Sequence, residues 1–446
     1  MSLYNQLKAR RANNEIIRIG LIGVGKFGTM FASQVIRLPG IHVVGVADLN
    51  VQSCKSNLKL AGWKPEMYDA KTLDKALESG TTCILENFGS LVNEPRIDII
   101  IECTGNPVKA VDHIIAAFES GKHVISATVE ADALCGPALA RKALELGVIY
   151  SMAYGDQPAM VCELVDWARV CGFDVIAAGR GHKWRSEYRS STPDTIWDYW
   201  GLTEEQAERG RLNPKMFNSF LDGTKPAIES SAISNATGLL APSNGLLYPS
   251  GSIDQIPMLM RPIHDGGILE GPGFVEVINS LDENGDMIDY DIRKGVWVTL
   301  KSANDYQQNC FEEYKVQTDD SGKYFTSYKR WHLIGLELGM SVANVGIRKE
   351  ATGVAREFLS DVVTIAKRDL KIGEVLDGEG GYTVSGDIRP SNISVKKNYL
   401  PLGLTAGVKM LRDVKANSIL SYDDISIEHQ TNAYKLRKSL EKSIKL

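Results

Sequence analysis

The chain has 446 residues, which is too long for one ordinary hydrophobic core, so two or three domains are expected. Hydrophobic residues make up 43% and charged residues 24% of the chain, as is typical of a soluble globular protein. The formal net charge of −5 argues against nucleic-acid binding, and no run of eighteen apolar residues offers a membrane span.

The N-terminal segment and the cysteines indicate the compartment. Residues 1–14 are polar and basic without an apolar core, unlike a secretory signal. The seven cysteines are scattered and form no CxxC pair, so neither a disulfide framework nor a built-in zinc site is expected. We therefore predict a cytoplasmic protein.

The first predicted elements form a dinucleotide-binding motif. A buried strand at 17–22 leads into a helix at 27–38, and a Gly-x-Gly-x-x-Gly turn joins them. Glycines at this spacing let the backbone turn tightly and approach a pyrophosphate, which the N-terminus of the helix also attracts. The predicted cofactor-binding residues of this turn are Gly23, Gly25, Lys26, Phe27 and Gly28.

Asp48 follows the next predicted strand, at 43–47, and lies twenty residues after Gly28. A carboxylate at this position can accept hydrogen bonds from the adenosine ribose. A 2′-phosphate carries about −1.5 to −2 charges, and each unit charge about 4 Å from a carboxylate costs about 1 to 4 kcal/mol. We therefore predict a preference for NAD over NADP. The alternative is an ordinary glycine turn in which Asp48 caps a helix.

The remaining elements of the first domain continue the alternation of strands and helices. This pattern predicts a parallel, Rossmann-type sheet in residues 1–155. Its further strands are expected at 97–103, 123–127 and 148–152. A long insert at 50–95 contains two helix-like pieces.

The middle of the chain, residues 156–350, is predicted to be an α+β domain for substrate binding and oligomerisation. Asn284-Gly285 is a signal for a type I′ hairpin turn. Helices are expected at 161–169, 203–210 and 217–236, and strands at 174–178, 274–282, 287–291 and 295–301.

Two segments near the C-terminus, 366–376 and 411–420, resemble each other. Each has Arg-Asp, an aliphatic residue, Lys and then an aliphatic pair. This pattern resembles the SAF domain, a small β-rich module. The expected fold is thus α/β in three domains, with the SAF-like domain at 351–446.

Polar residues follow the predicted strands of the first domain, on the edge of the sheet where ligands bind. Thr104, Gly105 and Asn106 are expected near the nicotinamide ribose, or else they form a plain turn. Three acidic residues, Glu130, Asp132 and Asp156, lie after later strands. Glu130 and Asp132 are candidates for contact with substrate or a cation, and the alternative is that they stabilise the start of a helix. Asp156 is a candidate for substrate binding, and the alternative is a helix N-cap.

Residues 179–189 are the most unusual segment, because cations and aromatic residues crowd what is expected to be a loop. Such a loop suits an anionic substrate, since arginine binds carboxylate and phosphate through two hydrogen bonds. Lys183 can donate a proton to a carbonyl oxygen as hydride arrives. The candidate substrate-binding residues here are Arg180, His182, Arg185 and Arg189. The alternative is a charged surface loop.

A second polar segment begins at Asp222-Gly-Thr-Lys225. Lys225 and Glu229 are four residues apart and so share one face of a helix. Asp222 and Lys225 are candidate catalytic residues, and Glu229 is a candidate for substrate binding. A surface ion pair is the alternative.

The order of these motifs resembles the homoserine dehydrogenase-like oxidoreductases that carry a C-terminal SAF domain, over residues 17–428. One branch of that group is the 1-deoxy-D-xylulose 5-phosphate reductoisomerase-like enzymes, which use NADPH. Two features depart from the group. Val129-Glu130 stands where homoserine dehydrogenases have Asn-Lys, and Asp222 with Lys225 only approximates their Asp-x-x-x-Lys pair. Asp48 also opposes the NADPH of the reductoisomerase-like branch.

The resemblance implies an NAD(P)-dependent oxidoreductase that acts on a small, polar, anionic hydroxy or keto compound. Two alternatives remain open. A reductoisomerase would need a divalent cation, for which Glu130, Asp132 and Asp156 are the candidate ligands. A nucleotide-sensing regulator would bind the cofactor without turnover. A homodimer or homotetramer is expected.

Overall fold

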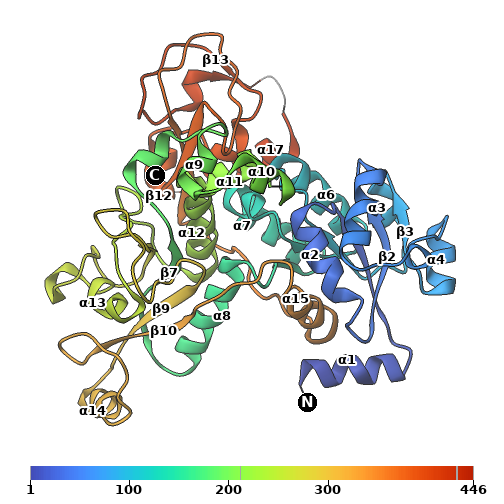
Figure 1. The fold of residues 1–446 in the computed structure, drawn as a ribbon, viewed down its shortest axis with the longest axis horizontal. Coiled ribbons are helices and arrows are strands. Elements are labelled where there is room, and N and C mark those ends of the chain that lie inside the picture. The colour runs from blue at the N-terminus through green and yellow to red at the C-terminus, as the bar shows by residue number, and fades with distance from the viewer. Residues whose placement is uncertain (1, 211, 428–429, 445–446) are drawn as a thin grey trace. The chain divides into compact units, whose positions relative to one another are not determined.

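The computed structural model describes residues 2–210, 212–427 and 430–444 (Figure 1). The chain forms two compact units. Unit 1 contains the residues up to Met160 together with Leu333–Arg356, and unit 2 contains Val161–His332 and the residues from Glu357 onward. The division falls inside helix α8 (Gln157–Val170). The three-part division expected from the sequence stays a prediction.

Unit 1 contains the predicted Rossmann-type sheet, which is confirmed. Six parallel strands lie in the order β3-β2-β1-β4-β5-β6. Their bounds are β1 (Ile17–Ile22), β2 (Ile41–Ala47), β3 (Cys83–Leu85), β4 (Ile99–Glu102), β5 (His123–Ser126) and β6 (Tyr150–Met152). Runs of isoleucine and valine form the strands because both faces of a parallel sheet are buried. Strand β3 was not predicted, since three residues inside the long insert leave little pattern.

The helices of unit 1 follow its strands. They are α1 (Leu3–Ala12), α2 (Lys26–Val35), α3 (Val51–Leu60), α4 (Leu73–Ser79), α5 (Gly89–Val92), α6 (Pro107–Glu119) and α7 (Val129–Glu145), with α15 (Gly339–Ala343) added by the returning chain. Helix α7 is kinked at Cys135, whose backbone is not helical, two residues before Pro137. In the insert, the indole of Trp63 donates a hydrogen bond of 2.8 Å to the Ala32 carbonyl of α2.

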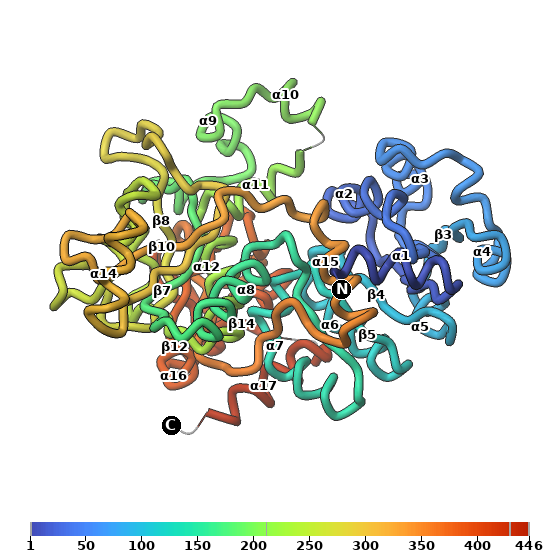
Figure 2. The backbone as a smooth tube through the Cα atoms, turned by 90° about the horizontal axis from the view of Figure 1, so that it is seen from below, coloured from blue at the N-terminus to red at the C-terminus, as the bar shows by residue number. Residues whose placement is uncertain are grey.

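Unit 2 is built on a four-stranded mixed sheet in the order β10-β9-β7-β8. Figure 2 shows β7, β8 and β10 together with helix α12. The strands are β7 (Asp174–His182), β8 (Phe274–Asn279), β9 (Val296–Lys301) and β10 (Tyr324–Lys329). Helix α12 (Thr224–Thr237) packs on β7 and β8. Trp297 of β9 is completely buried in this core.

The basic segment at 179–189 is not one loop, which corrects the sequence analysis. Strand β7 continues to His182, and residues 186–190 form a 3-10 turn. The two glycines make the strand possible. A Cβ atom would overlap the Glu276 carbonyl at Gly179 and the Ile292 carbonyl at Gly181. The predicted strand ended at residue 178, and its continuation to His182 was missed because glycine is generally unfavourable in strands.

Three further predictions about unit 2 were wrong. The expected helix at 217–236 is two helices, α11 (Pro214–Leu221) and α12, because Gly223 adopts a left-handed φ of 86° between them. Residues 287–291 form no strand, although Met287 makes an isolated bridge to Leu281. A turn is present at Gly285, which has a left-handed φ of 89°. It is not the predicted type I′ turn, because that type needs a positive φ at Asn284 as well, and Asn284 does not have one.

The described residues from 357 onward, here called the C-terminal module, contain short paired strands. These are β11 (Ser360–Ala366) with β12 (Val384–Pro390), and β13 (Lys409–Met410) with β14 (Ile425–Ser426). The other helices of unit 2 are α9 (Ile196–Trp200), α10 (Glu204–Arg209), α13 (Ile256–Leu259), α14 (Asp305–Glu313), α16 (Ser391–Lys396) and α17 (Asn432–Lys442).

The two similar segments of the C-terminal module pair with each other. Leu370 and Val414 exchange backbone hydrogen bonds of 2.8 and 3.0 Å. Two equivalent ion pairs flank them, Lys371 with Asp413 and Lys415 with Asp369, each at 2.8 Å. The internal similarity thus corresponds to a local two-fold arrangement. None of the described helices is long and apolar enough to cross a membrane.

Candidate active site

The glycine turn of unit 1 has the geometry that a bound dinucleotide needs. Gly23 adopts a left-handed φ of 89°. A Cβ atom at Gly28 would overlap the Gly23 carbonyl, so helix and turn approach as closely as glycine allows. Gly25, at the N-cap of α2, has no atom within 4 Å of the place where its Cβ would lie. The backbone there is open to a pyrophosphate, so these residues fit the cofactor.

Asp48 lies directly after β2 and contacts this turn. Its carboxylate accepts hydrogen bonds of 2.9 Å from the backbone N–H groups of Val24 and Asn50. The following helix, α3, is capped by Asn50 rather than Asp48. The alternative of Asp48 as a helix cap is therefore wrong. The half-buried carboxylate keeps further acceptor positions, because each oxygen has two lone pairs.

Glu102, at the end of β4, organises the neighbouring loop. Its buried carboxylate accepts hydrogen bonds from the hydroxyls of Thr104 and Thr128 and lies 3.3 Å from the His113 ring. Gly105 donates its N–H to the Thr128 hydroxyl at 3.0 Å. Asn106 caps helix α6. Glu102 was missed by sequence reasoning, although an acidic residue that ends an all-isoleucine strand is a signal.

The three acidic candidates lie in unit 1, but they differ in environment. Glu130 and Asp132 are in the first turn of α7, and the Asp156 carboxylate accepts the N–H of Gln157 at the start of α8. Asp132 is completely buried, and its carboxyl lies close to the Tyr150 hydroxyl and to other carboxylates. Burial, with a smaller contribution from nearby carboxylates, raises the pKa of Asp132 to about 8, although the Tyr150 hydroxyl opposes this shift.

In unit 2, two of the predicted substrate-binding residues are paired with each other. Arg180 of β7 and Glu229 of α12 form a buried ion pair. His182 is also buried, and its Nε2 lies 2.7 Å from the Phe220 carbonyl. Burial and then the charge of Arg180 hold the pKa of His182 well below its usual value, so this imidazole is neutral.

Of the two predicted proton donors, Lys183 lies farther along the same segment and Lys225 lies in helix α12. The Lys183 ammonium donates a hydrogen bond of 2.8 Å to the Tyr199 carbonyl, and burial followed by the charge of Arg293 lowers its pKa. Lys225 lies in the first turn of α12 and is half-buried. Arg185 pairs with the exposed Glu187 at 2.5 Å.

Asp222 is engaged by the C-terminal module. Its carboxylate forms a buried ion pair of 2.6 Å with Lys367 and accepts the N–H of Thr224. Lys367 also donates to the carbonyls of Ser191 and Gly381, both at 2.8 Å. The surroundings of Asp222 are those of a structural residue, and its catalytic role stays a prediction.

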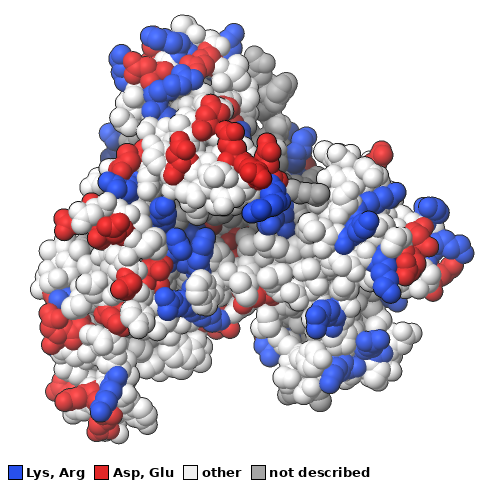
Figure 3. All heavy atoms as spheres, in the orientation of Figure 1, with Lys and Arg blue, Asp and Glu red and all other residues white. Residues whose placement is uncertain are grey.

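Sequence reasoning missed part of a basic cluster around the end of β7. Figure 3 shows Lys and Arg side chains gathering over β7 and α12. Lys294 is an exposed residue, but its ammonium group is largely surrounded by protein. The resulting loss of hydration, and then the charges of Arg180 and Arg293, lower the pKa of Lys294. Burial and then Arg180 lower the pKa of His332 to about 4, and this ring lies 2.7 Å from the Lys294 carbonyl. In the sequence, the adjacent Arg293 and Lys294 after the hairpin turn could have indicated this part of the cluster.

Two models of known families match parts of the chain. Residues 17–127 match the oxidoreductase family with an NAD-binding Rossmann fold, GFO/IDH/MocA. Residues 155–338 match the catalytic domain of oxidoreductase DRL. The chain is an NAD(P)-dependent oxidoreductase. The predicted enzyme class is thus confirmed, and the two matches are those of an NAD-binding domain and of an oxidoreductase catalytic domain.

A search of curated proteins finds no match to the oxidoreductase. Among solved structures, it resembles an NAD-binding oxidoreductase from Klebsiella pneumoniae (19% identity, TM-score 0.28, 40% of this chain and 47% of that chain). It also resembles a 3-ketoreductase from Actinomadura kijaniata (17%, 0.25, 38% and 49%) and scyllo-inositol dehydrogenase from Lactobacillus casei (17%, 0.26, 38% and 44%). The matched region spans less than half the length of each structure.

Proposed function

We propose that the enzyme transfers a hydride between a nicotinamide cofactor and the CH–OH carbon of a small anionic compound. The substrate class is a sugar phosphate, polyol or hydroxy acid, in its hydroxy or keto form. The basic cluster of unit 2 carries this proposal. The charge of Arg293 lowers the pKa of Lys183, and the charges of Arg180 and Arg293 lower the pKa of Lys294, so these cations lie close together. Glu229 pairs with Arg180, and Asp291 partly offsets the shift at Lys294. Excess positive charge in a partly buried region favours an anionic ligand.

The same cluster supports a lysine as the proton donor. A general acid works best when its pKa lies near the working pH, and the pKa of Lys183 is lowered toward that range. Lys225 remains the second candidate, with Arg180, Arg185 and Arg189 binding the anion. When hydride reaches the carbonyl carbon, the lysine ammonium protonates the oxygen. In the reverse direction the neutral amine accepts that proton.

Replacing Lys183 or Lys225 by methionine tests this assignment. We expect the variant that lacks the true acid to lose about a hundredfold in turnover, because general acid catalysis contributes about 10²–10⁴-fold. The measurement is kcat with NAD(H) over a panel of sugar phosphates and hydroxy acids. The variant of the other lysine is the internal control. Near-normal kcat in both variants would remove both lysines from the mechanism.

The position of Asp48 supports NAD as the preferred cofactor. Its carboxylate lies at the end of β2, directly beside the glycine turn. We expect Asp48→Ser to improve the relative affinity for NADP at least tenfold, because a 2′-phosphate no longer meets a negative charge. The readout is the ratio of Kd values for NADH and NADPH by fluorescence titration. An unchanged ratio would contradict the role of Asp48.

The reductoisomerase alternative needs a divalent cation. Within the described ranges, no three His, Cys, Asp or Glu side chains are arranged to hold a metal ion. The arrangement of Glu130, Asp132 and Asp156 therefore does not fit the cation, and no step is derived through a metal. Loss of activity with a chelator and recovery with Mg²⁺ or Mn²⁺ would restore this alternative.

Three further expectations belong to the same proposal. The enzyme forms a homodimer or homotetramer in the cytoplasm, which sedimentation and cell fractionation test. The C-terminal module is SAF-like and supports the homoserine dehydrogenase-like resemblance through its paired segments. A regulator that only senses nucleotide would bind NAD and turn over no member of the substrate panel.

A further inference from the structure

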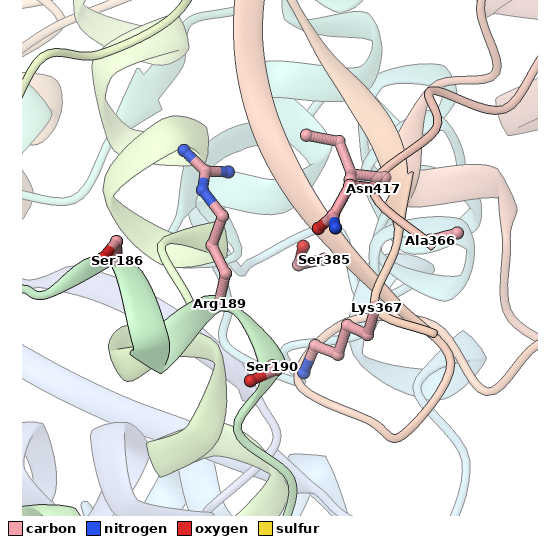
Figure 4. A pocket seen from close by; sticks show the side chains of 8 residues that line it. Ser186, Arg189, Ser190, Ala366, Lys367, Ser385 and Asn417 are labelled. Carbon is pink, nitrogen blue, oxygen red and sulfur yellow. The ribbon is translucent and has the colours of Figure 1, made fainter. Parts of the chain in front are cut away.

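A cavity of about 220 Å³ lies inside unit 2, where the segment 186–190 meets the C-terminal module. Figure 4 shows Arg189 on one side of this cavity and Ser385, Asn417 and Lys367 on the other. The volume exceeds the roughly 150 Å³ of an engineered cavity that holds benzene. Unlike that cavity, this one has mostly hydroxyl, amide and cationic side chains in its walls.

Two polar groups at the cavity are buried without a partner. Ser385 is 0% exposed, and its hydroxyl makes no hydrogen bond with any described residue. The Nη1 atom of Arg189 is likewise buried and unpartnered. A buried donor without an acceptor destabilises the folded protein. A ligand that accepts a hydrogen bond from this donor removes that cost, so its binding is favoured.

The charges near the cavity leave a positive excess. Arg189 lies 3.5 Å from the Asp387 carboxylate, which Arg389 also contacts at 2.9 Å. Lys367 is paired with Asp222. Three cations thus face two carboxylates in these pairs. The donors of Lys367 are all used, because its ammonium also bonds two backbone carbonyls. Arg189 is therefore the cation with donors to spare.

Arg189 is held in place without its hydrogen-bond donors being consumed. Its guanidinium lies 5.6 Å from the centre of the Trp184 ring, and that ring stacks on Tyr248 at 4.4 Å. This cation–π contact restricts the guanidinium, so less conformational entropy is lost when it binds an oxyanion. Ser186 and Ser190, on the same wall, offer hydroxyls for a neighbouring hydroxyl of the ligand.

We propose that this cavity binds the oxyanion end of a small hydroxylated substrate, through Arg189 on one wall and Ser385 and Asn417 of the C-terminal module on the other. This rests on the proposed function with an anionic substrate, and it assigns the residues that bind the anionic group. The C-terminal module is then part of the substrate-binding site of unit 2. Carboxylates and phosphates share the required chemistry, which is a charged group with oxygen acceptors beside hydroxyl groups.

Titration calorimetry of the full chain without nicotinamide cofactor tests this site. The probes are glycerate, inorganic phosphate and, as the uncharged control, glycerol. We expect saturable binding of at least one anion and binding of glycerol at least tenfold weaker. The tighter anion identifies the oxyanion class. Failure of both anions to bind the wild-type chain overturns the proposal.

Variants locate the binding. Arg189→Met is expected to weaken anion binding at least tenfold, and Ser385→Ala severalfold. Arg368→Met is the matched control. Arg368 lies in the C-terminal module, like Ser385, its side chain is half-exposed and pairs with Glu374, and it does not line the cavity. Equal losses in Arg189→Met and Arg368→Met overturn the site. Since Ser385→Ala only removes an unpartnered hydroxyl, it keeps the test decisive if Arg189→Met folds poorly.

Turnover separates this inference from the proposed function. If an anionic substrate is oxidised or reduced with NAD(H), Arg189→Met should raise its KM at least tenfold. An unchanged KM overturns the cavity as the substrate anchor and leaves the proposed function intact. Saturable anion binding that Arg189→Met abolishes, without turnover of any anionic hydroxy or keto compound, overturns the proposed function and leaves the binding site.

Discussion

Arg437→Ala is expected to lower the free energy of unfolding by about 3–5 kcal/mol, because it leaves a buried carboxylate without its counter-charge. Arg437 of α17 is completely buried. Its guanidinium donates two hydrogen bonds to Asp361 of β11 and a third, of 2.8 Å, to Glu441. It also lies 4.7 Å from the centre of the Phe358 ring. This pair fastens the C-terminal helix to the first strand of the C-terminal module.

Urea unfolding followed by circular dichroism measures the effect. Lys415→Ala is the matched control in the same module, because the Lys415 side chain is 83% exposed and that of its partner Asp369 is 48% exposed. Exposed pairs contribute about 0.2–1 kcal/mol. A double variant, Asp361→Asn with Arg437→Met, should recover much of the loss, since both charges are removed together. If Arg437→Ala is no more destabilising than Lys415→Ala, the buried pair does not hold α17.

Asp132→Asn is expected to remove a pH dependence of stability. In the folded protein the pKa of Asp132 is raised from its ordinary value of 3.8 to about 8, chiefly by burial. Between these values the folded state holds a proton that the unfolded state releases. Stability contributed by the neutral carboxyl is therefore fully present below pH 4 and is lost as the pH rises through 8. The slope reaches about 1.4 kcal/mol per pH unit.

The measurement is the free energy of unfolding at pH 5, 7 and 9. Asparagine resembles the neutral carboxyl, so the stability of Asp132→Asn should already exceed that of the wild type at pH 5 and exceed it by more at pH 7. The difference should level off above pH 8, the folded pKa of Asp132. Other groups contribute to the wild-type curve, among them Glu276, whose pKa burial raises to about 7. The difference between variant and wild type isolates Asp132. Asp69→Asn, at an exposed position of unit 1, is the control. A constant difference across the pH range would contradict the buried neutral carboxyl.

Local patterns in the sequence were sufficient for the nucleotide-binding half of the enzyme. The apolar runs that became β1, β2 and β4 are short-range signals, because a parallel strand is buried on both faces. The signal of the glycine turn is also local, because the atoms that leave no room for a side chain at Gly28 lie only a few residues away in the sequence. The oxidoreductase class followed from these features and from the familiar order of motifs.

The same reasoning failed where the local signal was ambiguous. Gly179 and Gly181 suggested a loop, yet both are glycine because neighbouring backbone carbonyls leave no room for a Cβ atom. Gly223 interrupts what looked like one helix. For Gly179 and Gly181 the decisive contact lies outside the local window.

The sequence by itself determined the Rossmann-type sheet, the cofactor turn and the enzyme class. Only the tertiary structure decided which charges meet. Arg180 pairs with Glu229, Asp222 with Lys367 and Asp361 with Arg437. These partners are far apart in the chain, and one charged residue in a sequence has many possible partners. Burial selects among them, because a charge removed from water must find a partner within a few ångströms, and only the packed fold determines which side chains lie that close.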